Sequence, residues 1–104
     1  MNLPDIETDE QIITQKKEKI KKPSMFKVLL HNDDYTSMEF VIKILRTVFN
    51  KSADDAVIIM LKIHREEIGI CGVYTYEIAE TKVKTVHSLA MERSFPLKCT
   101  MEAV

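Results

Sequence analysis

The 104-residue sequence contains only two glycines, three prolines and two cysteines, and it has no tryptophan. So few glycines leave no glycine-rich loop of the kind that cradles a phosphate group, which argues against a nucleotide-binding enzyme. The two cysteines, Cys71 and Cys99, are too few and too isolated for a disulfide framework or a four-ligand zinc site. We expect both thiols to be reduced and buried, because free cysteine usually behaves as a small apolar residue.

Neither sign of charge dominates, since 15 Lys and Arg residues stand against 16 Asp and Glu residues and the net charge is -1. A nucleic-acid partner would require a clustered basic face, so none is expected. No stretch approaches the roughly 18 consecutive apolar residues of a membrane span, and the N-terminus lacks the pattern of a secretory signal. We therefore predict a cytoplasmic monomer with no membrane partner and no cofactor.

A change of composition near Pro23 divides the chain into two parts. Residues 1–22 begin acidic, end basic and contain few large apolar side chains, which is typical of a mobile tail. Residues 23–104 carry apolar residues at regular spacing, and this length suits one domain with one modest core. We expect a tail followed by a single globular domain.

Three short segments of this domain have the pattern of β-strands. Residues 25–30 form an apolar run that is rich in strand formers. In residues 68–73 the apolar side chains alternate with small ones, and in residues 97–101 they alternate with polar ones, as in an antiparallel strand with one wet face. These segments predict a small antiparallel sheet.

Helical spacing and capping patterns predict three helices between and after these strands. Thr36 and Glu39 have the spacing of a capping box, and the first helix should end near Asn50. Ser52 repeats the pattern for a second helix that runs to about residue 64, and a third opens at Thr75. Together with the strands they predict an α+β domain with three helices packed on a three-stranded sheet. The side chains expected in the core are Met38, Val41, Leu45 and Val48, then Ala53, Ala56, Met60 and Ile63, then Ile78, Ala79, Val83, Val86 and Ala90.

The polar cluster Asn32-Asp33-Asp34 and His64 are the residues best suited to a ligand site. If the first two helices form a pair, these stretches approach one another near Met60 and Ile63. Oxygen acceptors, a histidine and flexible apolar side chains would together suit an amine attached to a large apolar group. Each feature also has a structural interpretation, in which the acidic cluster is a turn, the methionine belongs to the core and the histidine is structural.

Several of these segments closely resemble the ClpS adaptor family, in the same order and at compatible spacing. The resemblance rests on residues 23–30, 32–36 and 38–41, on Met60 and His64, and on residues 70–73 and 77–82, so it covers roughly residues 23 to 101. It implies a fold similar to the C-terminal domain of the ribosomal stalk protein. It also implies a non-enzymatic adaptor that binds N-degron substrates beginning with Leu, Phe, Tyr or Trp and delivers them to a ClpA- or ClpC-type Hsp100 unfoldase, which feeds the ClpP protease.

The resemblance also implies roles for individual residues in the substrate site. Asn32, Asp33 and His64 would hold the free α-amino group, which offers only hydrogen-bond donors. The His64 ring would serve in its neutral form, so binding should weaken in mild acid. Met38 resembles a gatekeeper that excludes β-branched first residues. The implied side-chain pocket consists of Asp34, Thr36, Met38, Val41, Met60, Ile63 and Leu97.

A second surface is implied for docking to the N-terminal domain of the unfoldase. It includes Glu77 and Lys82 at the start of the third helix, where exposed charges would otherwise serve only solvation. The mobile tail would be engaged by the pore of the unfoldase during delivery.

Three residues depart from the family pattern. Ser37 stands where the family often has proline, Ile63 stands where it frequently has a smaller residue, and Lys98 replaces a common apolar residue. We expect Ser37 to be neutral because Thr36 still caps the helix, and we expect Ile63 to narrow the pocket.

Two alternatives from other functional classes remain open at this stage. One is an interaction domain of the ribosomal-stalk type, which shares the architecture but need not bind an amino terminus. The other is a metal-dependent hydrolase built on Asp33, Asp34 and His64, although no further His or Cys ligand pattern accompanies them.

Overall fold

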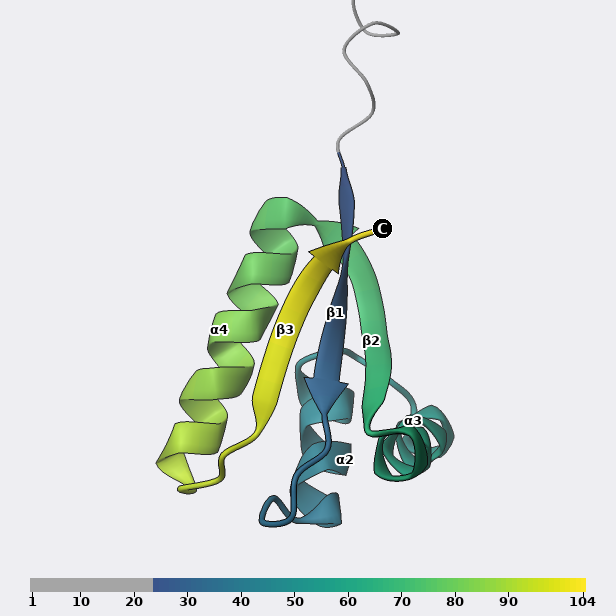
Figure 1. Cartoon of the computed structure of the whole chain (residues 1–104), viewed down its shortest axis with the longest axis vertical. Coiled ribbons are helices and arrows are strands. Elements are labelled where there is room, and N and C mark those ends of the chain that lie inside the picture. The colour runs from purple at the N-terminus through teal and green to yellow at the C-terminus, as the bar shows by residue number, and fades with distance from the viewer. Residues whose placement is uncertain (1–23) are drawn as a thin grey trace, which may run out of the picture.

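The computed structural model describes residues 24–104 and confirms the predicted order of strands and helices (Figure 1). The predicted tail, residues 1–22, lies outside the described residues. The α+β class is confirmed, with three helices and one antiparallel sheet of three strands within these described residues. The elements in chain order are β1 (Met25–His31), α2 (Met38–Thr47), α3 (Ala53–Glu66), β2 (Ile68–Thr75), α4 (Tyr76–Glu92) and β3 (Lys98–Ala103).

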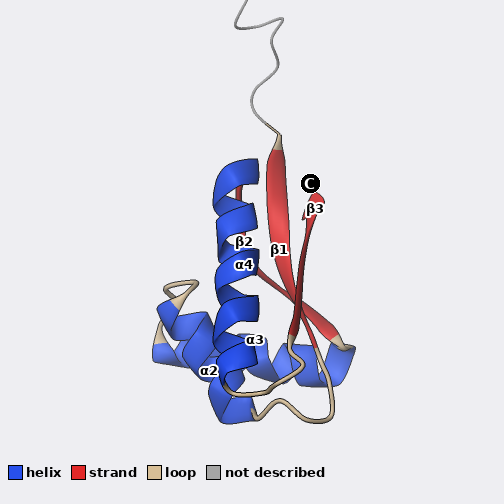
Figure 2. Ribbon diagram, turned by 90° about the vertical axis from the view of Figure 1, so that its left-hand side faces the viewer, coloured by secondary structure: helices blue, strands red, loops and turns tan. Residues whose placement is uncertain are grey.

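The sheet has β1 at its centre, with β2 on one side and β3 on the other, both antiparallel to it. Helix α4 contacts all three strands and lies along one face of the sheet (Figure 2). Helices α2 and α3 gather at the end of the sheet where β1 finishes (Figure 1). The loop after β1, the turn between α3 and β2 and the loop before β3 therefore meet at this one end.

The start of α2 differs from the prediction, because Ser37 and not Thr36 is its N-cap. The hydroxyl oxygen of Ser37 accepts a hydrogen bond from the Phe40 N–H at 3.1 Å. The hydroxyl and the N–H of Thr36 both donate to the carboxylate of Asp33, so Thr36 belongs to the preceding turn. Ser37 therefore supplies the cap, and the expectation that Thr36 caps the helix was wrong.

The other capping predictions are closer to the structure. Ser52 is the N-cap of α3, and its hydroxyl accepts from the Asp55 N–H at 3.1 Å. Thr75 is the N-cap of α4, although its side chain makes no capping hydrogen bond.

Two helices end away from their predicted positions. Helix α2 stops at Thr47, before Asn50, which has a left-handed backbone with φ of 55°. Helix α3 continues two residues past His64 to Glu66, and Glu67 closes it with φ of 72° and an N–H bond to the Ile63 carbonyl. Left-handed residues after helices are usually glycine and sometimes asparagine, so Asn50 gave a sequence signal near the end of α2, whereas Glu67 gave none at the end of α3.

The core lies between the sheet and the helices, and Val28, Leu30, Leu45 and Val86 are among its fully buried side chains. Both cysteines are free and buried, as predicted, and burial raises the pKa of each thiol to about 12.

Three of the expected core side chains are exposed instead. Ile78 is 50% exposed and Met38 is 47% exposed, and Ala53 is also exposed. Met38 and Ala53 are the first residues of their helices, where no preceding turn covers them. On α4 only Ala79, Val86 and Ala90 are buried, so the stripe that faces the narrow sheet is thinner than predicted.

No helix within residues 24–104 is both long enough and apolar enough to cross a membrane.

Candidate functional site

A small hollow lies at the end of the sheet where the loops meet. Its volume is about 20 Å³, which is room for roughly one water molecule. Six of its eight lining residues belong to the predicted substrate site, and they come from the loop after β1, from α2, from α3 and from the loop before β3. The lining residues are Leu30, His31, Asn32, Asp33, Thr36, Val41, Ile63 and Leu97.

The carboxylate of Asp33 organises the loop at the polar side of this hollow. Its Oδ1 accepts hydrogen bonds from the Tyr35 N–H at 2.8 Å and the Thr36 N–H at 2.7 Å, and its Oδ2 accepts one from the Thr36 hydroxyl at 2.8 Å. Partial burial opposes ionisation, but the bonds from Thr36 and Tyr35 outweigh it and hold the pKa of Asp33 below its ordinary value. Asp33 is therefore a fixed, ionised acceptor.

The neighbouring Asn32 is held through its backbone. Its N–H donates to the carbonyl of Glu67 at 2.8 Å, and the Glu67 N–H in turn donates to the carbonyl of Ile63 at 2.9 Å. The loop after β1 is thus tied to the end of α3. This connection places the polar loop beside the last turn of the helix that carries Ile63.

The apolar side of the hollow consists of well-buried side chains from three elements. Val41 of α2 is 8% exposed, Ile63 of α3 is 3% exposed and Leu97, just before β3, is 4% exposed. Leu30, at the end of β1, is fully buried beside them. The closely packed core supports this wall from behind.

Four of the predicted site residues do not line the hollow. Met60 is buried in the core, whereas Asp34 and Met38 are exposed near the start of α2. His64 is exposed on the last turn of α3, directly after Ile63 in the chain. His64 therefore does not line the hollow.

The prediction missed two lining residues, Leu30 and His31. The His31 ring nitrogen Nε2 lies 2.7 Å from the Thr100 hydroxyl oxygen, which connects β1 to β3. Burial and the nearby Lys98 cation lower the pKa of His31 below its usual value, against an opposing effect of Glu102. The only sequence signal was the position of His31 directly before Asn32.

The metal-site alternative finds no support in the part of the chain that the structure describes. Within residues 24–104, no group of three or more His, Cys, Asp or Glu side chains is placed to hold a metal ion. Asp33, Asp34 and His64 do not converge in that way.

The two predicted docking residues have different surroundings. Glu77 is exposed in the first turn of α4. The ammonium group of Lys82 donates to the Val48 carbonyl at 2.8 Å and lies 5.3 Å from the ring centre of Tyr74 and 6.0 Å from that of Phe49. Lys82 is half-buried and is therefore not the fully exposed charge that was expected, and its role in docking stays a prediction.

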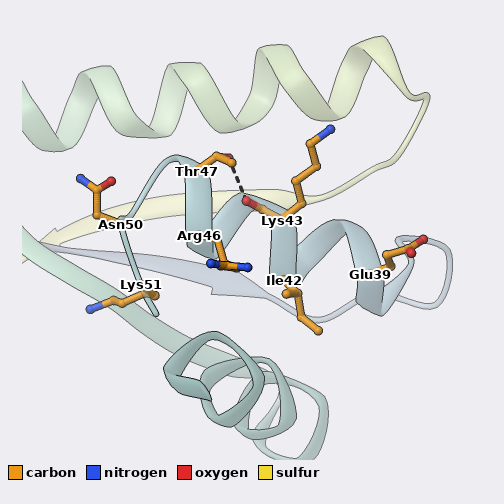
Figure 3. Close-up of a pocket in the computed structure, with 7 residues that line it drawn as sticks. All are labelled: Glu39, Ile42, Lys43, Arg46, Thr47, Asn50 and Lys51. Atoms are coloured by element: carbon orange, nitrogen blue, oxygen red, sulfur yellow. Dashed lines mark hydrogen bonds between the residues drawn. The ribbon is translucent and has the colours of Figure 1, made fainter. Parts of the chain in front are cut away.

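A larger groove of about 550 Å³ runs along the outer side of α2 (Figure 3). Its only large apolar side chain is Ile42, and three of its other side chains are cations. The groove lacks the apolar wall that a large apolar side chain requires, and none of the predicted site residues line it. It is lined by Glu39, Ile42, Lys43, Arg46, Thr47, Asn50 and Lys51.

Comparison with known proteins gives consistent matches along nearly the whole chain. A family model described as "ATP-dependent Clp protease adaptor protein ClpS" matches residues 21–100. The ATP-dependent Clp protease adapter protein ClpS of Desulforapulum autotrophicum is 58% identical over 102 residues, covering 98% of this chain and 96% of that protein. The protein of the same name from Desulfatibacillum aliphaticivorans is 57% identical over 91 residues and covers 88% of each chain.

A solved structure also matches the fold. It is that of Agrobacterium tumefaciens ClpS2 bound to L-phenylalaninamide, with a TM-score of 0.77 and 41% sequence identity. The match covers 80% of this chain and all of the other.

Proposed function

Because the chain belongs to the ClpS family of ATP-dependent Clp protease adaptors, we propose that it captures substrates by a free, bulky, apolar N-terminal residue and delivers them for degradation. The first residue of the substrate would be Leu, Phe, Tyr or Trp. The chain would act by binding alone, as an adaptor and not as an enzyme.

The observation that carries this proposal is the combination of a fixed ionised acceptor and a buried apolar wall around one hollow. Asp33 lies on the polar side, and Val41, Ile63 and Leu97 form the apolar side. A substrate that carries a free amino group and a large apolar side chain on the same carbon atom matches both sides at once. The ligand of the Agrobacterium relative, L-phenylalaninamide, has this chemistry.

The amino group would be held by acceptors only, since an ammonium offers three donors and no acceptor. A carboxylate presents about four lone-pair sites. The three bonds from Tyr35 and Thr36 leave about one of these sites on Asp33 free for the ligand. The Asn32 side chain and a neutral His64 ring would supply the remaining acceptors.

The apolar hollow must widen to accept a ligand, because about 20 Å³ is far smaller than a leucine side chain. Met38 and Met60 have flexible side chains that would move as the pocket opens, with Asp34 and Thr36 at its rim. Burial of a Leu or Phe side chain is worth about 1.5 to 3 kcal/mol, and each charge-assisted hydrogen bond about 1.5 to 3 kcal/mol. After the cost of association, these contributions correspond to an affinity near micromolar, roughly -8 kcal/mol.

Delivery would use a different part of the molecule. Glu77, together with the half-buried Lys82, would contact the N-terminal domain of a ClpA- or ClpC-type unfoldase in the cytoplasm. Residues 1–22 would be engaged by the unfoldase during transfer.

The test is an NMR titration of the uniformly labelled protein with a peptide that begins with Leu. We expect the amide shifts to change at residues 31–36 and 60–64, and the residues of the α2 groove to stay unchanged. Shifts confined to the groove would refute the proposed site.

A reconstituted degradation assay tests delivery separately. With a Clp unfoldase and protease, the adaptor should accelerate degradation of a reporter beginning with Leu and leave one beginning with Ser unaffected. Equal rates for the two reporters would contradict the proposed delivery.

A further inference from the structure

Gly69, the second residue of β2, lies directly behind the apolar wall of the hollow. It is buried, and it pairs with Leu30 across the sheet. A Cβ atom at this position would lie 2.6 Å from Cγ1 of Ile63 and 3.4 Å from its Cδ1. The longer arm of the Ile63 side chain therefore occupies the space that a side chain at position 69 would fill.

This contact is hard to relieve from the side of Ile63. Cγ1 is bonded directly to Cβ, so it moves only if the side chain turns about χ1 or if the backbone shifts. An isoleucine in a helix has one strongly preferred χ1 rotamer, and Ile63 lies within α3. The arm is thus held between α3 and β2, against Gly69.

We propose that Gly69 is a positioning residue that sets the size of the substrate pocket, because it lets the long arm of Ile63 rest against β2 instead of filling the hollow. The methyl group that distinguishes isoleucine from valine is Cδ1, and it lies over Gly69. This inference rests on the proposed function. The sequence led us to expect that Ile63 narrows the pocket. We infer instead that residues 63 and 69 form a pair, in which glycine at 69 makes room for the larger side chain at 63.

The first test is the variant Gly69→Ala, assayed with peptides that begin with Leu and with Trp. No glycine in the described residues has positive φ, so alanine fits the backbone and acts only through its methyl group. We expect that methyl to push Ile63 into the pocket and to weaken Trp binding by about tenfold more than Leu binding, the usual effect of one carbon in an apolar pocket.

Gly72→Ala is the matched control on the same strand. Its new methyl would meet the ring and hydroxyl of Tyr74, the outer end of a side chain that does not line the hollow. We expect this control to leave the ratio of Trp to Leu affinity within about two-fold of the unmodified protein. Circular dichroism shows whether each variant is folded.

The double variant Gly69→Ala with Ile63→Val tests the pairing itself. Valine keeps Cγ1, which the new methyl displaces, but it lacks Cδ1, so the displaced side chain reaches less far into the hollow. The double variant should therefore recover much of the Trp binding that Gly69→Ala loses. If Gly69→Ala does not fold, the single variant Ile63→Val still tests whether Cδ1 of Ile63 narrows the pocket. A pocket narrowed by Cδ1 would then gain affinity for Trp by about tenfold relative to Leu, whereas our proposal predicts a change of less than about two-fold.

The outcomes separate this inference from the proposed function. If the unmodified protein binds neither peptide, the proposed function fails and the inference fails with it. If the unmodified protein binds both, an unchanged Trp to Leu ratio in folded Gly69→Ala overturns the inference alone.

Discussion

At the scale of single residues, Asp33 combines a structural and a binding task in one carboxylate. Its bonds to Tyr35 and Thr36 fix the turn that precedes α2, and the same bonds keep it ionised. An orientation held in advance lowers the cost of ordering the site when a ligand binds. Substitution of Asp33 should therefore affect stability as well as affinity, in contrast to a residue that only touches the ligand.

The variant Asp33→Asn should be less stable than the unmodified protein by roughly 1 to 2 kcal/mol at neutral pH, because charged hydrogen bonds are lost. The pKa of Asp33 is lowered on folding, so its contribution is complete above its ordinary value of 3.8 and is lost as the pH falls through the folded value. Urea denaturation of both proteins should show a gap that narrows below pH 3.8. A gap that stays constant down to that range and below it would contradict the assignment.

A peptide beginning with Leu should bind more weakly in mild acid than at neutral pH, because an imidazolium at position 64 would offer no acceptor and would repel the ammonium. The variant His64→Gln retains an acceptor oxygen that does not titrate, and its affinity should change less over this range. Fluorescence anisotropy at each pH measures both. If the variant keeps the full pH dependence, the responsible group is not His64, and His31 in the lining becomes the next residue to test.

Substitution of Lys82 should lower the stability of the protein more than substitution of Glu77. Lys82→Met removes the bond to the Val48 carbonyl and the contacts with two aromatic rings, and it should cost about 1 kcal/mol. Glu77→Gln changes an exposed side chain and should stay within about 0.5 kcal/mol. Thermal unfolding measures both, and equal stability of the two variants would show that the Lys82 contacts contribute nothing.

At the scale of elements, the type and order of strands and helices follow from the apolar periodicity, whereas several boundaries do not. Ser52 caps α3 as predicted, because Asp55 supplies the N–H at the expected spacing. Thr36 matched the same rule and failed, because Asp33 competes for its N–H and hydroxyl. A capping pattern cannot reveal a competing side chain upstream.

Glu67, directly after α3, has a left-handed backbone that is unfavourable for a residue other than glycine. A left-handed backbone costs a non-glycine residue about 1 to 2 kcal/mol, and glycine avoids this cost. Glycine in turn loses about 0.5 to 1 kcal/mol more conformational entropy on folding. Glu67→Gly should therefore stabilise the protein by up to about 1 kcal/mol. The neighbouring Glu66→Gly, within α3, should destabilise it, and chemical denaturation of the two variants measures the contrast. Loss of stability in Glu67→Gly would contradict this assignment of strain.

At the scale of the whole molecule, the fold brings together at one end of the sheet segments that lie far apart in the sequence. The sequence and its resemblance to the ClpS family predicted Asn32, Asp33, Thr36, Val41, Ile63 and Leu97, and all six line one hollow. Their individual roles as substrate ligands stay predictions.

Other features of the site depend on contacts between distant segments and could not be predicted from local patterns. The small size of the hollow reflects how α2, α3 and the loop before β3 close around it. The position of Gly69 behind Ile63 depends on the register between β1 and β2. His31 lines the hollow and contacts Thr100, which is 69 residues away in the sequence.

The central claim is that the hollow recognises a free amino terminus together with a bulky apolar side chain. Fluorescence anisotropy with three labelled peptides tests it most directly: one beginning with Leu, the same peptide N-acetylated, and one beginning with Ser. Acetylation removes the charge and places a carbonyl against acceptors, so only the free Leu peptide should bind, near micromolar affinity. Equal binding of all three peptides, or of none, would contradict the account.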